Sequence, residues 1–248
     1  MKIWVDGQCF QTGSNVRGIG RYVIDFLKEL SEKNVELVVS LNGAMKQEVV
    51  AARNYIKRVI PECDIQVWYG TSTQGEIVTA YSQERMLDEH ILTTHINEIN
   101  PDIALSPSPF EGTGDASNPF IKVGELNKNI ITSCIYHDAI PHRYPDIYLQ
   151  DENAYKLYYR RFEQIPNFNV VLCNSQFTED EYQDIYEQTN SVAISAGLSD
   201  DIQALINSWV YDENSIGAQY GDYVVYVGGM DWRKNVPCLV KAMANLSA

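Results

Sequence analysis

Long apolar runs are absent from this sequence, and basic residues are in short supply. No stretch of about 18 consecutive apolar residues occurs, so the sequence does not predict a transmembrane helix. The 19 lysines and arginines are outnumbered by 33 acidic residues, which gives a formal net charge of −14. This charge disfavours binding to the phosphate backbone of nucleic acids and to anionic membranes. We therefore expect neither a nucleic-acid partner nor a membrane span.

Cysteines are few, and none is spaced like a metal ligand. Their number is odd and they are scattered, which argues against a disulfide framework and against a zinc site. The chain also reaches Asp6 before the apolar segment of a secretory signal could form. We expect a cytoplasmic protein with reduced thiols, with peripheral attachment at the inner membrane face as an alternative. The cysteines are Cys9, Cys63, Cys134, Cys173 and Cys238.

The signature motifs of several enzyme classes are also missing. The sequence has no G-x-x-x-x-G-K-[ST] loop, no G-x-S-x-G elbow, no H-E-x-x-H and no Asp-x-Asp cation motif. The sequence therefore gives no motif support for a kinase, a serine hydrolase or a zinc protease. We expect no metal ion and no cofactor.

What the sequence does contain is a regular alternation of strand-like and helix-like segments. This alternation predicts a Rossmann-like, doubly wound parallel α/β sheet with helices on both faces. Apolar runs predict strands at 3–5, 35–40, 65–69, 103–106, 130–136, 169–172 and 192–194. Apolar residues three and four apart predict helices at 20–30, 44–60, 86–99, 151–165 and 200–209, and a capping box of Thr178 and Glu181 predicts a further helix start.

A second domain is predicted to begin near the end of the sequence. The apolar run 223–227 predicts a buried strand, and 236–246 predicts the helix that follows it. We place the first domain at 1–210, a linker at 211–222 and the opening strand–helix unit of a second domain at 223–248. We expect a truncated fragment whose unpaired strand promotes a homodimer, strand exchange or docking onto the first domain.

The first candidate binding motif is Arg17-Gly-Ile-Gly-Arg21, between the first strand and its helix. Gly18 and Gly20 would let main-chain N–H groups approach a phosphate or a sugar at the start of the helix. Arg17 and Arg21 are candidates for acceptor or sugar contacts. The alternative is a tight turn flanked by solvated arginines. Because position 23 is Val, the motif lacks the third glycine of the dinucleotide fingerprint. This weakens the alternative interpretation as an NAD-dependent oxidoreductase.

The second candidate is His137-Asp138, at the carboxyl end of a predicted strand. Open α/β sheets bind ligands at this edge, so His137 is placed to contact a sugar and Asp138 to orient groups near it. The alternative is a strand end with a half-buried histidine. The spacing of His137 and His142 fits no common metal site. Ser175, which also follows a strand, is a candidate ligand contact or a turn residue.

The third candidate is Gly228-Gly229-Met-Asp-Trp-Arg233-Lys234. Two glycines after a strand, followed by two cations at a helix start, suit a diphosphate because amides and cations together neutralise it. The alternative is an Arg233–Lys234 pair solvated at a domain boundary.

Taken together, these segments resemble glycosyltransferase family 4, whose members are retaining sugar transferases of the GT-B fold. The resemblance spans nearly the whole chain and implies the amino-terminal half of such a fold. It is carried, in the order of the family, by residues 17–22, 137–145, 174–178 and 226–235.

The resemblance implies transfer of a hexose, with retention, from a nucleotide-diphosphate sugar to a saccharide or lipid-linked acceptor in bacterial polysaccharide synthesis. The amino-terminal domain would bind the acceptor and the carboxyl-terminal domain the donor. By motif match, Gly18 and Gly20 would lie near the donor diphosphate, which Arg233 and Lys234 would hold. His137 would contact the donor sugar or the reacting centre, and is our candidate catalytic residue.

Two departures from the family qualify this interpretation. The paired glutamates of the family's carboxyl-terminal domain have no counterpart, and Ile194-Ser-Ala-Gly197 stands where a Pro-Asn-Gly turn is usual. The fragment alone is therefore expected to be inactive. The rival interpretation is a non-catalytic sugar- or nucleotide-binding module. Residues 107–119, rich in Pro, Gly and Ser, are expected to form an acceptor-facing loop.

Overall fold

The chain divides into two compact units, Met1–Gly197 and Leu198–Ala248. The structure, a computed structural model, describes residues 1–79, 82–210, 212, 214, 216–220, 223–229 and 231–246. The first unit holds the whole sheet. Helix α9 (Asp200–Ser208) falls in the second unit, although the sequence interpretation placed it in the first domain. Among the described residues, no helix combines the length and apolar character needed to cross a bilayer.

The first unit is built on one parallel sheet of seven strands in the order β3-β2-β1-β4-β5-β6-β7. The predicted doubly wound α/β fold is confirmed. The order reverses direction between β1 and β4, where Val5 pairs with Val39 on one side and Leu105 on the other. The strands are β1 (Lys2–Asp6), β2 (Glu36–Asn42), β3 (Asp64–Trp68), β4 (Ile103–Ser106), β5 (Ile131–Tyr136), β6 (Val170–Cys173) and β7 (Ser191–Ala193).

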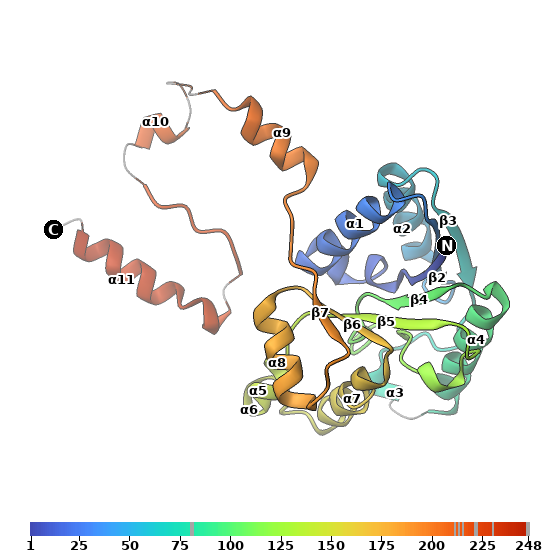
Figure 1. Cartoon of the computed structure of the whole chain (residues 1–248). Coiled ribbons are helices and arrows are strands. Elements are labelled where there is room, and N and C mark those ends of the chain that lie inside the picture. The colour runs from blue at the N-terminus through green and yellow to red at the C-terminus, as the bar shows by residue number, and fades with distance from the viewer. Residues whose placement is uncertain are drawn as a thin grey trace. The chain divides into compact units, whose positions relative to one another are not determined.

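Helices cover both faces of this sheet because its side chains alternate between two apolar cores. On β1, Ile3 and Val5 belong to one core and Trp4 to the other. Helices α1 and α2 pack on one face, and α4, α7 and α8 on the opposite face (Figure 1). The helices of this unit are α1 (Gly18–Ser31), α2 (Lys46–Val59), α3 (Glu76–Thr79), α4 (Gln83–Ile99), α5 (Ile140–Arg143), α6 (Pro145–Tyr148), α7 (Glu152–Phe162) and α8 (Gln176–Tyr186).

Buried polar groups at the carboxyl ends of β1 and β2 hold the long loop that follows β4. The carboxylate of Asp6 accepts hydrogen bonds from the main-chain N–H of Phe120 at 2.7 Å and from the side chain of Gln8 at 3.0 Å. The Gln8 side chain in turn bonds the main chain of Asn118, and the Asn42 amide donates to the carbonyl of Ala116 at 3.1 Å. The loop is therefore positioned by the sheet itself.

The burial of Asp6 predicts a distinctive pH dependence of stability. Burial raises its pKa from 3.8 to about 6. The pKa of Asp6 is higher in the folded state than in the unfolded state, so its protonated form stabilises the fold. This contribution to the free energy of unfolding is fully present below about pH 4 and is lost as the pH rises through about 6, by up to about 3 kcal/mol. Urea unfolding across this range should show the loss in the wild type, and Asp6→Asn should remove it. The other titrating groups are the same in the wild type and the variant. If the free energy of unfolding falls equally steeply with pH in Asp6→Asn, the loss does not come from Asp6.

In the second unit, the predicted helix 236–246 is present as α11 (Val236–Leu246), and α10 (Ile216–Tyr220) precedes it. Residues 223–227, predicted to be a strand, are not in a strand. Their side chains are 37–90% exposed, with Val227 at the upper limit. A parallel strand needs a neighbouring strand for its main-chain groups, and the described residues of this unit supply none.

Candidate functional site

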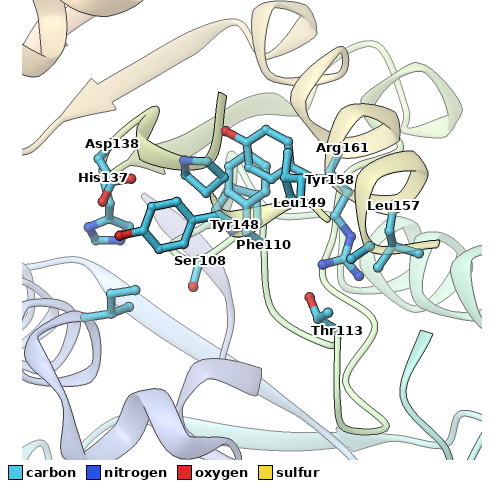
Figure 2. A pocket seen from close by; sticks show the side chains of 14 residues that line it. Ser108, Phe110, Thr113, His137, Asp138, Tyr148, Leu149, Leu157, Tyr158 and Arg161 are labelled. Carbon is cyan, nitrogen blue, oxygen red and sulfur yellow. The ribbon is translucent and has the colours of Figure 1, made fainter. Parts of the chain in front are cut away.

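A cavity of about 310 Å³ opens at the carboxyl ends of β4 and β5, next to the point where the strand order reverses. Ligands of open α/β sheets bind at this place. Its wall comes from the loop after β4, from the segment after β5, from the start of α1 and from α7 (Figure 2). The loop 107–119, which is predicted to face an acceptor, forms part of this wall. It contributes Ser108, Pro109, Phe110 and Thr113.

His137 follows β5 directly and lines the cavity. Its Nε2 atom lies 2.9 Å from the carbonyl oxygen of Pro107. Because a carbonyl oxygen can only accept, Nε2 carries the proton, and Nδ1 holds the lone pair of the neutral ring. Burial lowers the pKa of His137 below its ordinary value, which favours the neutral ring at pH 7. The geometry thus leaves Nδ1 able to accept a hydrogen bond from a hydroxyl.

Asp138 lines the same cavity, whereas Ser175 is not among the lining residues. One carboxylate oxygen of Asp138 accepts a hydrogen bond from the N–H of Ile140 at 3.0 Å, and the side chain is exposed. The hydroxyl of Ser175 caps α8 by accepting from the N–H of Thr178 at 3.1 Å. Ser175 therefore serves as the N-cap of α8, and its contact with a ligand stays a prediction.

The predicted capping box of Thr178 and Glu181 is wrong. The true cap lies three residues earlier, at Ser175, because its hydroxyl reaches the N–H groups at the start of α8. The carboxylate of Glu181 instead accepts from the N–H of Ala139 at 3.2 Å and pairs with Arg143. Glu181 therefore fixes the segment that follows β5, beside the cavity.

Gly18 and Gly20 lie inside the first turn of α1, which begins earlier than predicted. A Cβ atom at Gly18 would meet nothing within 4 Å. At Gly20 it would lie 2.5 Å from the carbonyl oxygen of Ser14 and 2.6 Å from the Cα of Asn15. Main-chain atoms cannot rotate away, so Gly20 is needed for packing. Ile19, between the two glycines, is the residue of this turn that lines the cavity.

The two glycines provide a matched pair of substitutions. Gly20→Ala should lower the free energy of unfolding by about 1–3 kcal/mol, because the added methyl group overpacks the turn against α1. Gly18→Ala should change it by less than about 0.5 kcal/mol. Urea unfolding followed by circular dichroism gives both values. Equal losses in the two variants would contradict the packing role of Gly20.

Arg17 and Arg21, predicted to contact an acceptor or a sugar, are exposed and do not line the cavity. The structure brings His137 and Asp138 together there with Ile19, and leaves the two arginines outside it. Their role toward a ligand stays a prediction.

A buried network of charges stands behind one wall of the cavity. Arg161 on α7 is 2% exposed and pairs with Glu76 of α3, which is itself 1% exposed. The neighbouring Arg160 bonds the other oxygen of Glu76 at 2.7 Å and also pairs with Glu89 of α4. Lys122 lies 3.1 Å from the second oxygen of Glu89. The network ties α3, α4 and α7 together, and Arg161 lines the cavity.

Sequence reasoning missed Arg161, although one signal for it was present. Arg161 follows Leu157 by four residues, so the two lie on the same face of α7, and both line the cavity. A cation on the apolar face of an amphipathic helix needs a buried counter-charge. That charge, Glu76, lies 85 positions away in the sequence and had no recognisable pattern.

Arg233 and Lys234 form a short 3₁₀ turn in the second unit, after Gly228 and Gly229. The side chain of Arg233 pairs with Asp231, with Nε 2.8 Å from Oδ1. Both cations and both glycines are exposed. The role of these four residues in holding a diphosphate stays a prediction.

Comparison with known proteins relates the chain to sugar transferases. No protein-family model matches it. Over an alignment of 265 residues that covers the whole chain, it is 24% identical to the serotype-specific mannosyltransferase WbdA of Escherichia coli, and it spans 30% of that protein. A solved structure described as the glycotransferase of kitacinnamycin is similar with a TM-score of 0.43 and 13% identity, over 92% of this chain and 54% of that one.

Proposed function

We propose that this chain is part of a glycosyltransferase that moves a hexose from a nucleotide-diphosphate sugar to a hydroxyl of a saccharide or lipid-linked acceptor. The observation that carries the proposal is the 24% identity, over the whole chain, to a mannosyltransferase. The cavity at the carboxyl ends of β4 and β5 supports it, because parallel sheets bind ligands there. We propose with it that the protein belongs to family 4, retains the anomeric configuration and serves bacterial polysaccharide synthesis. Its proposed location is cytoplasmic, with peripheral attachment at the inner membrane face as the alternative.

In the proposed reaction, the bond between the anomeric carbon and the diphosphate breaks through an oxocarbenium-like state. The acceptor oxygen bonds the anomeric carbon on the same face, and the proton of its hydroxyl passes to the leaving diphosphate. Arg233 and Lys234 neutralise the leaving diphosphate, and no metal ion or cofactor takes part. His137 holds a sugar hydroxyl through Nδ1, since its Nε2–H is engaged by Pro107. The supporting observation is that His137 lies in the cavity wall, where burial lowers its pKa below the ordinary value and so favours the neutral ring.

We further propose that the second unit self-associates. The supporting observation is that the apolar residues 223–227 are 37–90% exposed, and such segments are stabilised by contact with another protein surface. Light scattering of the 248-residue chain should show a dimer, and Val225→Lys should shift it toward the monomer. A wild-type monomer at all concentrations would reject this proposal.

A panel of nucleotide sugars tests the function. The product of the complete gene should release nucleoside diphosphate only when an acceptor is present, and the new bond should keep the anomeric configuration of the donor. The 248-residue chain by itself should transfer little sugar, because the turn proposed to hold the diphosphate is exposed. Saccharide or nucleotide binding by the complete gene product, without any turnover, would instead favour a non-catalytic binding module.

A further inference from the structure

The cavity at β4 and β5 offers a ligand few unsatisfied polar groups. Five of its fourteen lining residues are Ser, Thr, His, Asp or Arg, and four of these five already bond to other parts of the protein. A hexose carries several hydroxyls, and each one buried without a partner weakens binding. The cavity therefore does not suit a whole sugar ring. The four bonded residues are Ser108, His137, Asp138 and Arg161, and the fifth is Thr113.

The other nine lining residues are aliphatic, aromatic or proline, and the only polar atoms of their side chains are the hydroxyls of Tyr148 and Tyr158. The hydroxyl of Tyr158 is buried without a hydrogen-bond partner. Phe110 and Tyr158 stack with their ring centroids 5.1 Å apart and their planes at 22°. The stack continues through Phe162, at 5.3 Å from Tyr158, to His142, at 4.7 Å from Phe162. Four stacked rings form a supported wall, so the apolar surface is organised before a ligand arrives.

His137 and Asp138 are neighbours in the wall of the cavity. Figure 2 shows His137 and Asp138 together at one end, while Leu149, Leu157 and Arg161 lie away from them. The guanidinium of Arg161 is already engaged by the carboxylate of Glu76 and by the main-chain carbonyl of Glu111. The exposed carboxylate of Asp138 disfavours a phosphate at the other end. A ligand that fits is amphiphilic, with a neutral polar head at His137.

We propose that this cavity binds the hydrocarbon part of a neutral alkyl glycoside or glycolipid acceptor, with the sugar head at its His137 end. Its volume, about 310 Å³, is at the lower end of small-molecule pockets and suits one short length of chain. The assignment of this ligand as the acceptor rests on the proposed sugar transfer. The apolar selectivity rests on the cavity alone.

Calorimetric titration of the 248-residue chain with a matched pair of glycosides tests the proposal. The probes are n-octyl α-D-mannopyranoside, kept below its micelle concentration, and methyl α-D-mannopyranoside. The octyl compound should bind about tenfold more tightly or better, because its methylene groups leave water. n-Octyl phosphate should bind more weakly than the octyl glycoside. Equal affinities of the two glycosides, or tighter binding of the phosphate, would overturn the proposal.

A pair of alanine-to-phenylalanine variants locates the binding. Ala154 lines the cavity, so Ala154→Phe should fill it and weaken octyl binding about tenfold or more. Ala51, exposed on α2, provides Ala51→Phe as the control, which should bind like the wild type. Octyl binding that survives Ala154→Phe would place the alkyl chain elsewhere, for instance on residues 223–227, and would reject the proposal.

A measurement on the unmutated chain guards against misfolding of the variant. Nuclear Overhauser contacts should join the octyl methylene protons to the rings of Phe110 and Tyr158, and their absence would reject the cavity as the site. These experiments report binding alone. A preference for the alkyl glycoside without sugar transfer would therefore reject the proposed function and keep the proposed binding site. Sugar transfer without an alkyl preference would reject the binding site and keep the proposed function.

Discussion

Replacing Glu76 by alanine should lower the free energy of unfolding by about 3–5 kcal/mol, because it removes the counter-charge of two arginines. Arg161 is 2% exposed and cannot recover its hydration by moving into water without opening α7. Arg160 would lose its bond to Glu76 and keep its pairing with Glu89. Urea unfolding of the 248-residue chain, followed by circular dichroism, gives the difference directly.

The exposed pair of Glu152 and Lys156 on the same helix is the control. It is also a carboxylate–cation pair, one turn apart on α7, but both side chains lie at the surface. Solvent screens such pairs, so Glu152→Ala should leave the unfolding midpoint nearly unchanged. A similar shift in Glu152→Ala and Glu76→Ala, or a loss below about 1 kcal/mol in Glu76→Ala, would contradict the role given to the buried network.

Replacing His137 by alanine should slow sugar transfer by about 100-fold, the effect expected when one positioned hydrogen-bonding group is lost from a reacting centre. The sign of the pH dependence follows from the ring's charge state. Burial lowers the pKa of His137, so the active neutral form should persist as the pH falls to the ordinary titration range of histidine and be lost only below it. Initial rates of the complete gene product across this range measure both effects.

His90 supplies a control for this substitution. It is exposed on α4, away from the lining of the cavity, so His90→Ala should keep the wild-type rate and pH profile. A His137→Ala variant with wild-type turnover would show that the ring serves only the fold, through its bond to Pro107. That result would leave the cavity without its proposed reacting-centre residue.

The sheet could be predicted from the sequence because its signals are local. Apolar runs such as those of β1, β5 and β6 are too short for helices and are separated by amphipathic segments of three- and four-residue spacing. Parallel strands joined by helices leave few arrangements, and all have the strand ends on one edge. The position of His137 at that edge followed from the same pattern.

Features that depend on contacts between distant segments could not be predicted. The sequence predicts a phosphate-binding role for Gly20, which stays a prediction. It does not show that a side chain at this position would clash with main-chain atoms of Ser14 and Asn15, which pack against α1. The sequence does not show that Arg161 pairs with Glu76, because the two residues are 85 positions apart. The run 223–227 has the composition of a strand, yet a strand forms only where another supplies hydrogen-bonding partners.

The most direct test of the account is whether the octyl glycoside is itself glycosylated in the cavity. The complete gene product should convert n-octyl α-D-mannopyranoside, with a suitable nucleotide sugar, to a product one hexose heavier in the mass spectrum. Ala154→Phe should abolish this product, and Ala51→Phe should form it at the wild-type rate. A product that forms equally well in Ala154→Phe would contradict the central claim that the acceptor lies in the cavity beside β4 and β5.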